Sequence, residues 1–182
     1  MRKTLITTLV AGLFATTAFA AMNPMVGGAE MFAEKNIVEN AMNSKDHTTL
    51  VAAVAAAGLV DTLKGAGPFT VFAPTNEAFA ALPAGTVDKL LQPDMKDTLV
   101  KVLTCHVVGA AAFAADVQKM IADDGGMHKI KTLGGCELTA SVKDGKVLIT
   151  DENGGIATVT IADVKQSNGV IHVIDKVLLP KS

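Results

Sequence analysis

A cysteine and a histidine stand side by side in the segment TCHVVG, as Cys105 and His106, and such a pair could do chemistry in more than one way. A catalytic dyad needs the imidazole within hydrogen-bond reach of the thiol. The apolar run CHVV predicts a strand, in which neighbouring side chains point to opposite faces, so the two groups should be separated. A zinc site needs clustered ligands, but the second cysteine, Cys136, stands alone. The remaining interpretation is a disulfide between Cys105 and Cys136.

The start of the chain supports that pairing. Residues 1–20 have a basic beginning, an apolar run and an Ala-Phe-Ala end, which is the pattern of a bacterial secretory signal peptide. The run is too short to span roughly 30 Å of hydrocarbon, so we expect no membrane span in the mature protein. Export would place the chain in a periplasm or outside the cell, where disulfides persist. Residues 21–35 predict a flexible leader, and residues 36–180 a single domain.

Other signatures of catalysis or metal binding are missing from the sequence. It contains neither a G-x-S-x-G nucleophile segment nor a phosphate-binding G-x-x-x-x-G-K segment. Asp123-Asp124 could attract a cation, but no loop of alternating oxygen ligands follows, so a solvated helix end is expected. Asp151-Glu152-Asn153 similarly predicts a polar turn. We therefore expect no catalytic residue, no metal site and no cofactor.

The charge balance narrows the class of partner. Without Arg2 and Lys3 of the signal peptide, 14 of the 16 basic residues remain against 18 acidic ones, a net charge of −4. That balance argues against nucleic acid or an anionic membrane as the partner. The chain also has no Tyr and no Trp, which leaves little aromatic surface on which bases could stack.

The expected elements change character along the chain. Between residues 36 and 64, apolar residues recur at helical spacing. The segment 69–74 alternates as a short buried strand, and further helices follow it. From residue 136 to 179, short strands alternate with glycine-containing turns, which predicts an antiparallel meander. Helices first and strands later favour an α+β domain.

Two of the other three histidines stand in segments whose pattern predicts their role. His172 stands among aliphatic residues in VIHVID, where a histidine is more often a core residue with a satisfied hydrogen bond than a ligand or a catalyst. His47 stands at a predicted helix start, where we expect a solvated end residue.

Three segments together resemble the fasciclin (FAS1) domain family. They are FTVFAPTNEAF at 69–79, L-x-C-H-V at 103–107 and NGVIHVIDKVLLP at 168–180, in the family's order and spacing. The resemblance runs from about Asn36 to Pro180. It implies a wedge of two antiparallel-rich β-sheets flanked by helices, in a small secreted bacterial member. Members of this family are associated with cell adhesion and matrix contacts rather than catalysis.

The resemblance also carries over candidate contact residues. The middle segment of the family usually holds Tyr-His, so His106 is retained, while Cys105 takes the place of the tyrosine. In animal matrix members, an aspartate–aliphatic pair before the last segment contributes to integrin binding, and Asp163-Val164 matches it. The resemblance therefore implies His106, Asp163 and Val164 as partner-binding residues. For the aspartate–aliphatic pair we weigh a structural role higher, because a shared fold does not imply a shared function.

Asn76, His172 and Asp175 belong to the family segments too, and we expect them to be structural. Asn76 and His172 should bridge backbone groups where helix and sheet meet, since an unpaired buried polar group costs about 1–3 kcal/mol. The functional hypothesis is an exported, non-enzymatic module that contacts a cell-surface or extracellular protein or glycan. The alternative is a periplasmic carrier or sensor, which would hold a small apolar ligand or a metal between helices and sheet.

Overall fold

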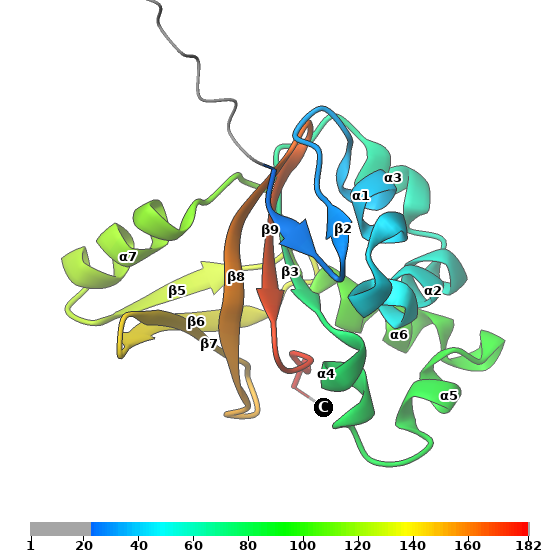
Figure 1. Ribbon diagram of the computed structural model, residues 1–182. Helices are drawn as coiled ribbons and strands as arrows, with labels where there is room; N and C mark the ends of the chain where they lie inside the picture. Colours follow the sequence, from blue (N-terminus) through cyan, green and yellow to red (C-terminus); the bar gives the residue numbers. More distant parts are fainter. Residues whose placement is uncertain (1–22, 182) are drawn as a thin grey trace, which may run out of the picture.

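The computed structural model describes residues 23–181 of the 182-residue chain, so the predicted signal peptide lies outside the described residues. Helices and strands form the predicted α+β domain, in which a twisted sheet separates a group of helices from a single isolated helix (Figure 1). Among residues 23–181, no helix has both the length and the apolar character needed to cross a membrane.

Within residues 23–181, seven α-helices flank the sheet, and local sequence explains where several of them begin and end. Asn36 and Glu39 form a reciprocal capping box at the start of the first helix. Gly58 ends the second helix in the left-handed conformation, at a φ of 73°. The helices are α1 (Ile37–Asn43), α2 (Thr48–Ala57), α3 (Val60–Lys64), α4 (Asn76–Ala80), α5 (Thr86–Leu90), α6 (Lys96–Thr104) and α7 (Ala114–Asp123).

Seven strands are hydrogen-bonded in the order β4-β3-β9-β8-β7-β6-β5. All neighbours are antiparallel except β3 and β9, which pair in parallel from Phe69↔Gly169 to Pro74↔Ile174. The strands are β3 (Phe69–Pro74), β4 (Val107–Val108), β5 (Met127–Lys131), β6 (Glu137–Lys143), β7 (Lys146–Thr150), β8 (Ile156–Gln166) and β9 (Gly169–Ile174). The meander expected in the last third of the chain is confirmed.

The wedge shape comes from strand β8, which belongs to both arms of the sheet. Its first residues, Ile156–Thr158, pair with β7, and its later residues pair with β9 across two register shifts. Such irregularities bend a strand and increase its twist. One arm, β3 and β9, therefore runs at a steep angle to the other arm, β5 to β7 (Figure 1).

Two hydrophobic cores lie on opposite sides of β3 and β9. Val71, Ile171 and Val173 face the larger core with helices α1 to α6, whereas Phe72 and Ile174 face the smaller core under α7. This division follows the period-two alternation of strand side chains. The smaller core is completed by the inward residues of the β5–β8 arm: Ile130, Leu138, Ala140, Val147, Ile149, Ala157 and Val159.

The prediction of a flexible leader at 21–35 is wrong for the part of it that the structure describes. Met25–Val26 (β1) and Ala29–Glu30 (β2) form a small antiparallel hairpin. Val26 and Met31 are only 3% and 2% exposed, because they pack into the larger core. Met31 therefore anchors this segment in the core, whereas Met25 is exposed.

The predicted strand at CHVV begins two residues later than expected. Cys105 is the C-terminal cap of helix α6, and only Val107–Val108 pair with β3. Cys105 and His106 are therefore not neighbours within one strand, and the alternation of strand side chains does not describe how they point. Cys105 is joined to Cys136, with the two Cα atoms 5.4 Å apart, so the disulfide ties the end of α6 to the loop before β6.

Removal of this disulfide should destabilise the domain. The variant Cys105→Ala/Cys136→Ala is expected to lose roughly 3–4 kcal/mol of unfolding free energy, because the bond closes a long loop in the unfolded chain. Urea unfolding monitored by circular dichroism measures the loss. A reductant should lower the stability of the wild-type protein toward that of the variant and leave the variant unchanged. Labelling of both thiols in oxidised, denatured protein would contradict the pairing.

Candidate functional site

His106 is a buried connection between helix α6 and the end of the chain. Its Nδ1 donates to the Val102 carbonyl oxygen at 2.8 Å, and its Nε2 accepts from the Leu178 backbone N–H at 2.9 Å. The side chain is 2% exposed and both ring nitrogens are used. A group in that position cannot touch a partner, so the assignment of His106 as a partner-binding residue is wrong. The Sγ of the adjacent Cys105 is in the disulfide, which leaves no thiol for a dyad.

His172 is the core residue that its aliphatic surroundings predict. Its Nδ1 accepts from the Asp163 backbone N–H at 3.3 Å, and its Nε2 donates to the Ala112 carbonyl oxygen at 2.8 Å. The ring stacks on Phe72, with centroids 5.8 Å apart. These contacts join β9, the bend in β8 and the approach to α7, so His172 holds backbone groups in place.

The Asp163-Val164 pair has a structural role in this fold. Val164 is fully buried in the larger core and cannot meet a partner, so its assignment as a contact is wrong. Asp163 is exposed and adopts a positive φ of 59° at the register shift in β8. Its Oδ1 accepts from the backbone N–H of Ala114, the first residue of α7, at 2.6 Å. A carboxylate is favourable at a helix N-terminus, so Asp163 anchors α7 to the bend.

Asn76 and Asp175 form the bridges expected of structural residues. Asn76 Oδ1 accepts from the Thr49 backbone N–H at 3.0 Å, and its Nδ2 donates to the Lys45 carbonyl oxygen at 2.8 Å. It thereby joins the start of α4 to the start of α2. Asp175 Oδ1 accepts from the Thr158 backbone N–H at 2.7 Å, just beyond the end of β9.

Two buried polar residues were missed or misplaced by sequence reasoning. His47 is 3% exposed, with Nδ1 accepting from Ser44 Oγ at 2.8 Å, so its prediction as a solvated end residue is wrong. Asn168 lies in the turn between β8 and β9 and is buried. Its side chain donates to the Leu63 and Gly65 carbonyl oxygens and accepts from the Ile37 backbone N–H. These partners lie about a hundred residues away in sequence, which no local pattern reveals.

The polar turn 151–155 fastens the C-terminal segment. Asp151 Oδ2 accepts from the Leu179 backbone N–H at 3.0 Å, while its Oδ1 accepts from two backbone N–H groups of its own turn. Glu152 accepts from the backbone N–H of Lys181 and of Glu137, and these bonds lower the pKa of its carboxyl. The turn therefore satisfies backbone donors of its own and of other segments.

These contacts leave little for chemistry at the sites singled out by residue type. The three buried histidines use both ring nitrogens on neighbouring groups. Within residues 23–181, no three His, Cys, Asp or Glu side chains gather in a way that could hold a metal ion. The candidate for function is therefore a surface rather than a constellation of reactive groups.

One face of the β5–β7 arm provides such a surface, which we call the open face. Helix α7 covers the other face, and Figure 1 shows no helix over this one. Every residue of the open face is exposed or half-buried. The face consists of Met127, Lys129, Lys131, Glu137, Thr139, Ser141, Lys143, Lys146, Leu148, Thr150, Ile156 and Thr158.

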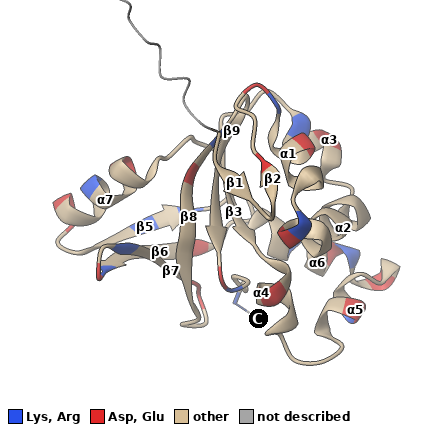
Figure 2. Cartoon of the chain, viewed as in Figure 1, with Lys and Arg blue, Asp and Glu red and all other residues tan. Residues whose placement is uncertain are grey.

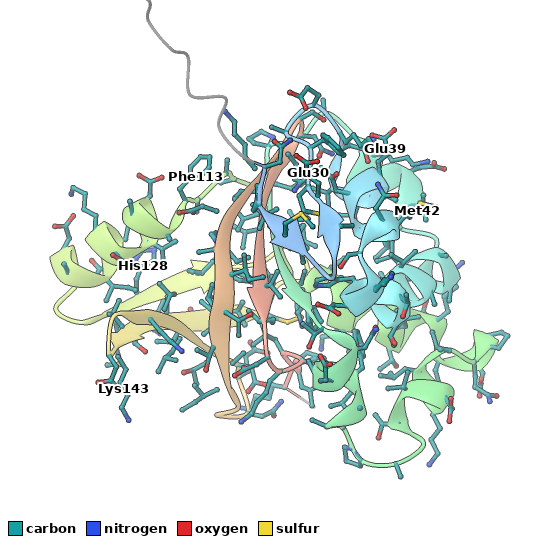
Figure 3. The ribbon with its side chains drawn as sticks, viewed as in Figure 1. Glu30, Glu39, Met42, Phe113, His128 and Lys143 are labelled. Atoms are coloured by element: carbon teal, nitrogen blue, oxygen red, sulfur yellow. A yellow bond between two sulfur atoms is a disulfide. The ribbon has the colours of Figure 1, made fainter. Side chains whose placement is uncertain are left out.

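The open face is hydroxyl-rich and locally basic, although the whole chain carries a net charge of −2. It has four lysines and one acidic residue, Glu137, which pairs with Lys129 at 2.7 Å. Figure 2 shows basic positions along β5 and β6, and Lys143 extends from the outer end of the sheet in Figure 3. Met127 and Ile156 add apolar area, being 65% and 47% exposed. The alternation of residues 137–150 indicates such a polar face in the sequence, because the polar positions of an alternating strand lie on one side of the sheet.

The bridging role of Asn76 predicts a loss of stability on truncation. Asn76→Ala should lower the free energy of unfolding by about 1–3 kcal/mol, because the Thr49 and Lys45 backbone groups would lose their partner. Thermal unfolding measures the effect, and Glu77→Ala, at an exposed neighbouring position, is the matched control. His172→Ala should behave like Asn76→Ala. An unchanged melting temperature in either variant would count against the bridging role.

The buried histidines predict that stability falls as the pH is lowered. Burial lowers the pKa of His106 to about 4, and it lowers the pKa of His47 and of His172 as well. The unfolded chain therefore binds more protons than the folded one below the ordinary histidine pKa of 6.5. Stability is fully present above that pH and is lost toward pH 4. His106 alone should remove about 2 kcal/mol between about pH 7 and pH 5.

Urea unfolding at several pH values measures this dependence. The variant His106→Gln retains a donor and an acceptor but cannot titrate, so its stability should fall less steeply with acidification than that of the wild type. The slope is the readout, and it is separate from any constant loss of stability that the substitution causes. Equal slopes in the two proteins would show that His106 does not control the dependence.

The sequence and the fold both match known proteins. The fasciclin domain family model matches residues 45–180. Protein sll1483 of Synechocystis sp. is 51% identical over 180 residues, which cover 91% of this chain and 93% of that protein. Cell surface glycolipoprotein MPB83 of Mycobacterium bovis is 34% identical over 168 residues, covering 89% and 69% of the two chains.

A solved FAS1 domain pair from the insect cell adhesion molecule fasciclin I has the same fold. It superposes with a TM-score of 0.71 over 80% of this chain and 51% of that chain, at 20% identity. The wedge of sheet with flanking helices, implied by the three sequence segments, is thus confirmed. With its family match over residues 45–180 and a relative that is half identical over nearly its whole length, the chain belongs to the fasciclin (FAS1) domain family.

Proposed function

We propose that this protein is an exported, non-enzymatic interaction module that associates with a cell-surface or extracellular partner through the open face. Export is supported by the secretory pattern of residues 1–20 and by the buried disulfide, which suits an oxidising compartment. One relative is named a cell surface glycolipoprotein, and the structural neighbour comes from a cell adhesion molecule. Those names concern the relatives, and they favour the same class of role here.

The observation that carries the proposal is the composition of the open face. A sheet face without a covering helix would normally be polar. This one combines exposed Met127 and Ile156 with rows of hydroxyl groups and lysines at its margin. Lysines at the rim of a contact steer an oppositely charged partner, while apolar side chains supply area that is removed from water. The partner that fits is an acidic protein or an acidic glycan.

In this proposal the open face makes the contact, instead of the three residues that the family resemblance implied. Of His106, Asp163 and Val164, only Asp163 is exposed, and its carboxylate already binds the first backbone N–H of α7. The open face requires no rearrangement to meet a partner. The protein would reside in a periplasm or outside the cell, where such partners are found.

Reversal of charge on the open face tests the proposal. The variant Lys129→Glu/Lys143→Glu/Lys146→Glu should reduce binding of the labelled mature protein to envelope preparations from its source organism by about tenfold, because rim charges set association and salt dependence. Sedimentation of the preparations measures the bound fraction. Wild-type binding should also weaken as salt is added.

The matched control is Lys45→Glu/Lys89→Glu/Lys96→Glu, which changes the net charge equally at exposed positions on the helical side. This control should bind like the wild type. Equal losses in both triple variants would indicate a non-specific charge effect, and unchanged binding in the open-face variant would rule out this surface. Circular dichroism checks that each variant remains folded.

A further inference from the structure

An apolar cavity of about 230 Å³ lies on the helical side of the domain, remote from the open face. Helices α1, α2 and α3 form its walls, and the sheet edge at β3 and β4 forms its floor. Its wall and floor residues include Val38, Ala41, Val54, Leu63, Val71 and Val107. Only two of the helix residues that line it, Ala41 and Ala55, have small side chains, and the space between the helices is not filled.

The lining of the cavity excludes a polar occupant. All but two of the lining residues are aliphatic or Met, and the exceptions are His106 and Lys64. His106 reaches the floor, but both its nitrogens already have backbone partners. Water entering such a space would find almost no hydrogen-bond partner, and apolar cavities of this kind stay dry and accept apolar molecules. No Phe, Tyr or Trp side chain lines it, so an aliphatic chain fits better than a ring system that needs stacking.

The volume of the cavity limits the length of the aliphatic chain that it can hold. A water molecule in the liquid takes up roughly 30 Å³, and a methylene group is of similar size, so a cavity of 230 Å³ holds about eight methylene groups. This is shorter than a membrane lipid tail and longer than a solvent molecule.

The mouth of the cavity favours a ligand that has a negatively charged head group. Met42, Ala55 and Lys64 are lining residues that are also exposed, so they border the opening to solvent. Met42 is 65% exposed on the outer side of α1, as Figure 3 shows, and a thioether chain can move aside for a ligand. Among residues 23–181, Lys64 forms no ion pair, so its ammonium group is available at the rim.

We infer that this cavity binds a medium-chain aliphatic carboxylic acid, with the alkyl chain between α1, α2 and α3 and the carboxylate beside Lys64. Insertion of the alkyl chain removes apolar surface of the cavity wall and of the ligand from water, which is the main favourable contribution to binding. The carboxylate stays at the surface, where an ammonium group can pair with it without the cost of burying a charge. This site is separate from the open face, so either function can fail without the other.

Titration of the mature protein with decanoate tests the site. Binding should shift the methyl resonances of cavity residues in carbon–proton NMR spectra and leave those of the smaller core unchanged. Ala55→Leu places a larger side chain in the mouth and should weaken decanoate binding by about tenfold or more, because the space is then filled. Ala56→Leu is the matched control, since Ala56 is exposed on the same helix but does not line the cavity.

The variant Lys64→Gln tests the contribution of the ligand's head group separately from that of its alkyl chain. This variant should weaken the affinity for decanoate several-fold and leave that for decan-1-ol unchanged, since an alcohol has no charge to pair. The absence of methyl shifts with decanoate, or equal affinities in the Ala55→Leu and Ala56→Leu variants, would overturn the site.

Sedimentation with dioleoylphosphatidylglycerol vesicles distinguishes a free acid from a lipid in a bilayer. The inferred site predicts decanoate binding without co-sedimentation. Vesicle binding that Ala55→Leu abolishes, in a protein that gives no response to decanoate, would assign the cavity to membrane lipid and overturn the free-acid inference.

Discussion

The parallel pairing of β3 with β9 is the constraint on which the rest of this domain depends. The two strands lie a hundred residues apart in sequence, yet they pair over six positions, and all but the first residue of each is buried. Strands buried on both faces are nearly continuous apolar runs, as VFA is here and as VIHVI is apart from His172. Because alternate side chains enter opposite cores, this pair separates the core of α1 to α6 from the core under α7, and β8 pairs with β9 across two register shifts.

Buried polar side chains then hold the elements around that pair. His106, His172 and Asn168 each connect segments that are distant in sequence through backbone groups. A buried polar group is tolerated when its hydrogen bonds are satisfied, and among the described residues no buried side-chain nitrogen or oxygen lacks a partner. The residue types that attract attention as catalysts are used here for architecture. The proposed functions use a surface and a cavity that this framework creates.

Two such features arise on different sides of the wedge. The open face exists because α7 covers only one side of the β5–β7 arm. The cavity exists because helices α1, α2 and α3 meet above β3 and β4 without filling the space between them. Neither depends on a reactive side chain, and each follows from how helices are distributed over the sheet (Figure 1).

The sequence by itself determined the features that depend on local pattern. Alternation in 137–150 revealed the meander, the two cysteines and the secretory start indicated the disulfide, and three segments identified the family. Local pattern failed where a distant segment decides the outcome. Val26 and Met31 are buried because the larger core has room for them, which their glycine-rich surroundings do not show.

Only the tertiary structure decided which candidate contact residues are accessible. His106 is buried between helix α6 and the C-terminal segment and Val164 is buried in the larger core, although the family resemblance implied both as contacts. The open face needs the register of four strands, and the cavity needs the placement of three helices. Residue type and spacing specify individual helices and strands. The exposure of a side chain depends on long-range packing, which is determined only by the assembly of all the elements.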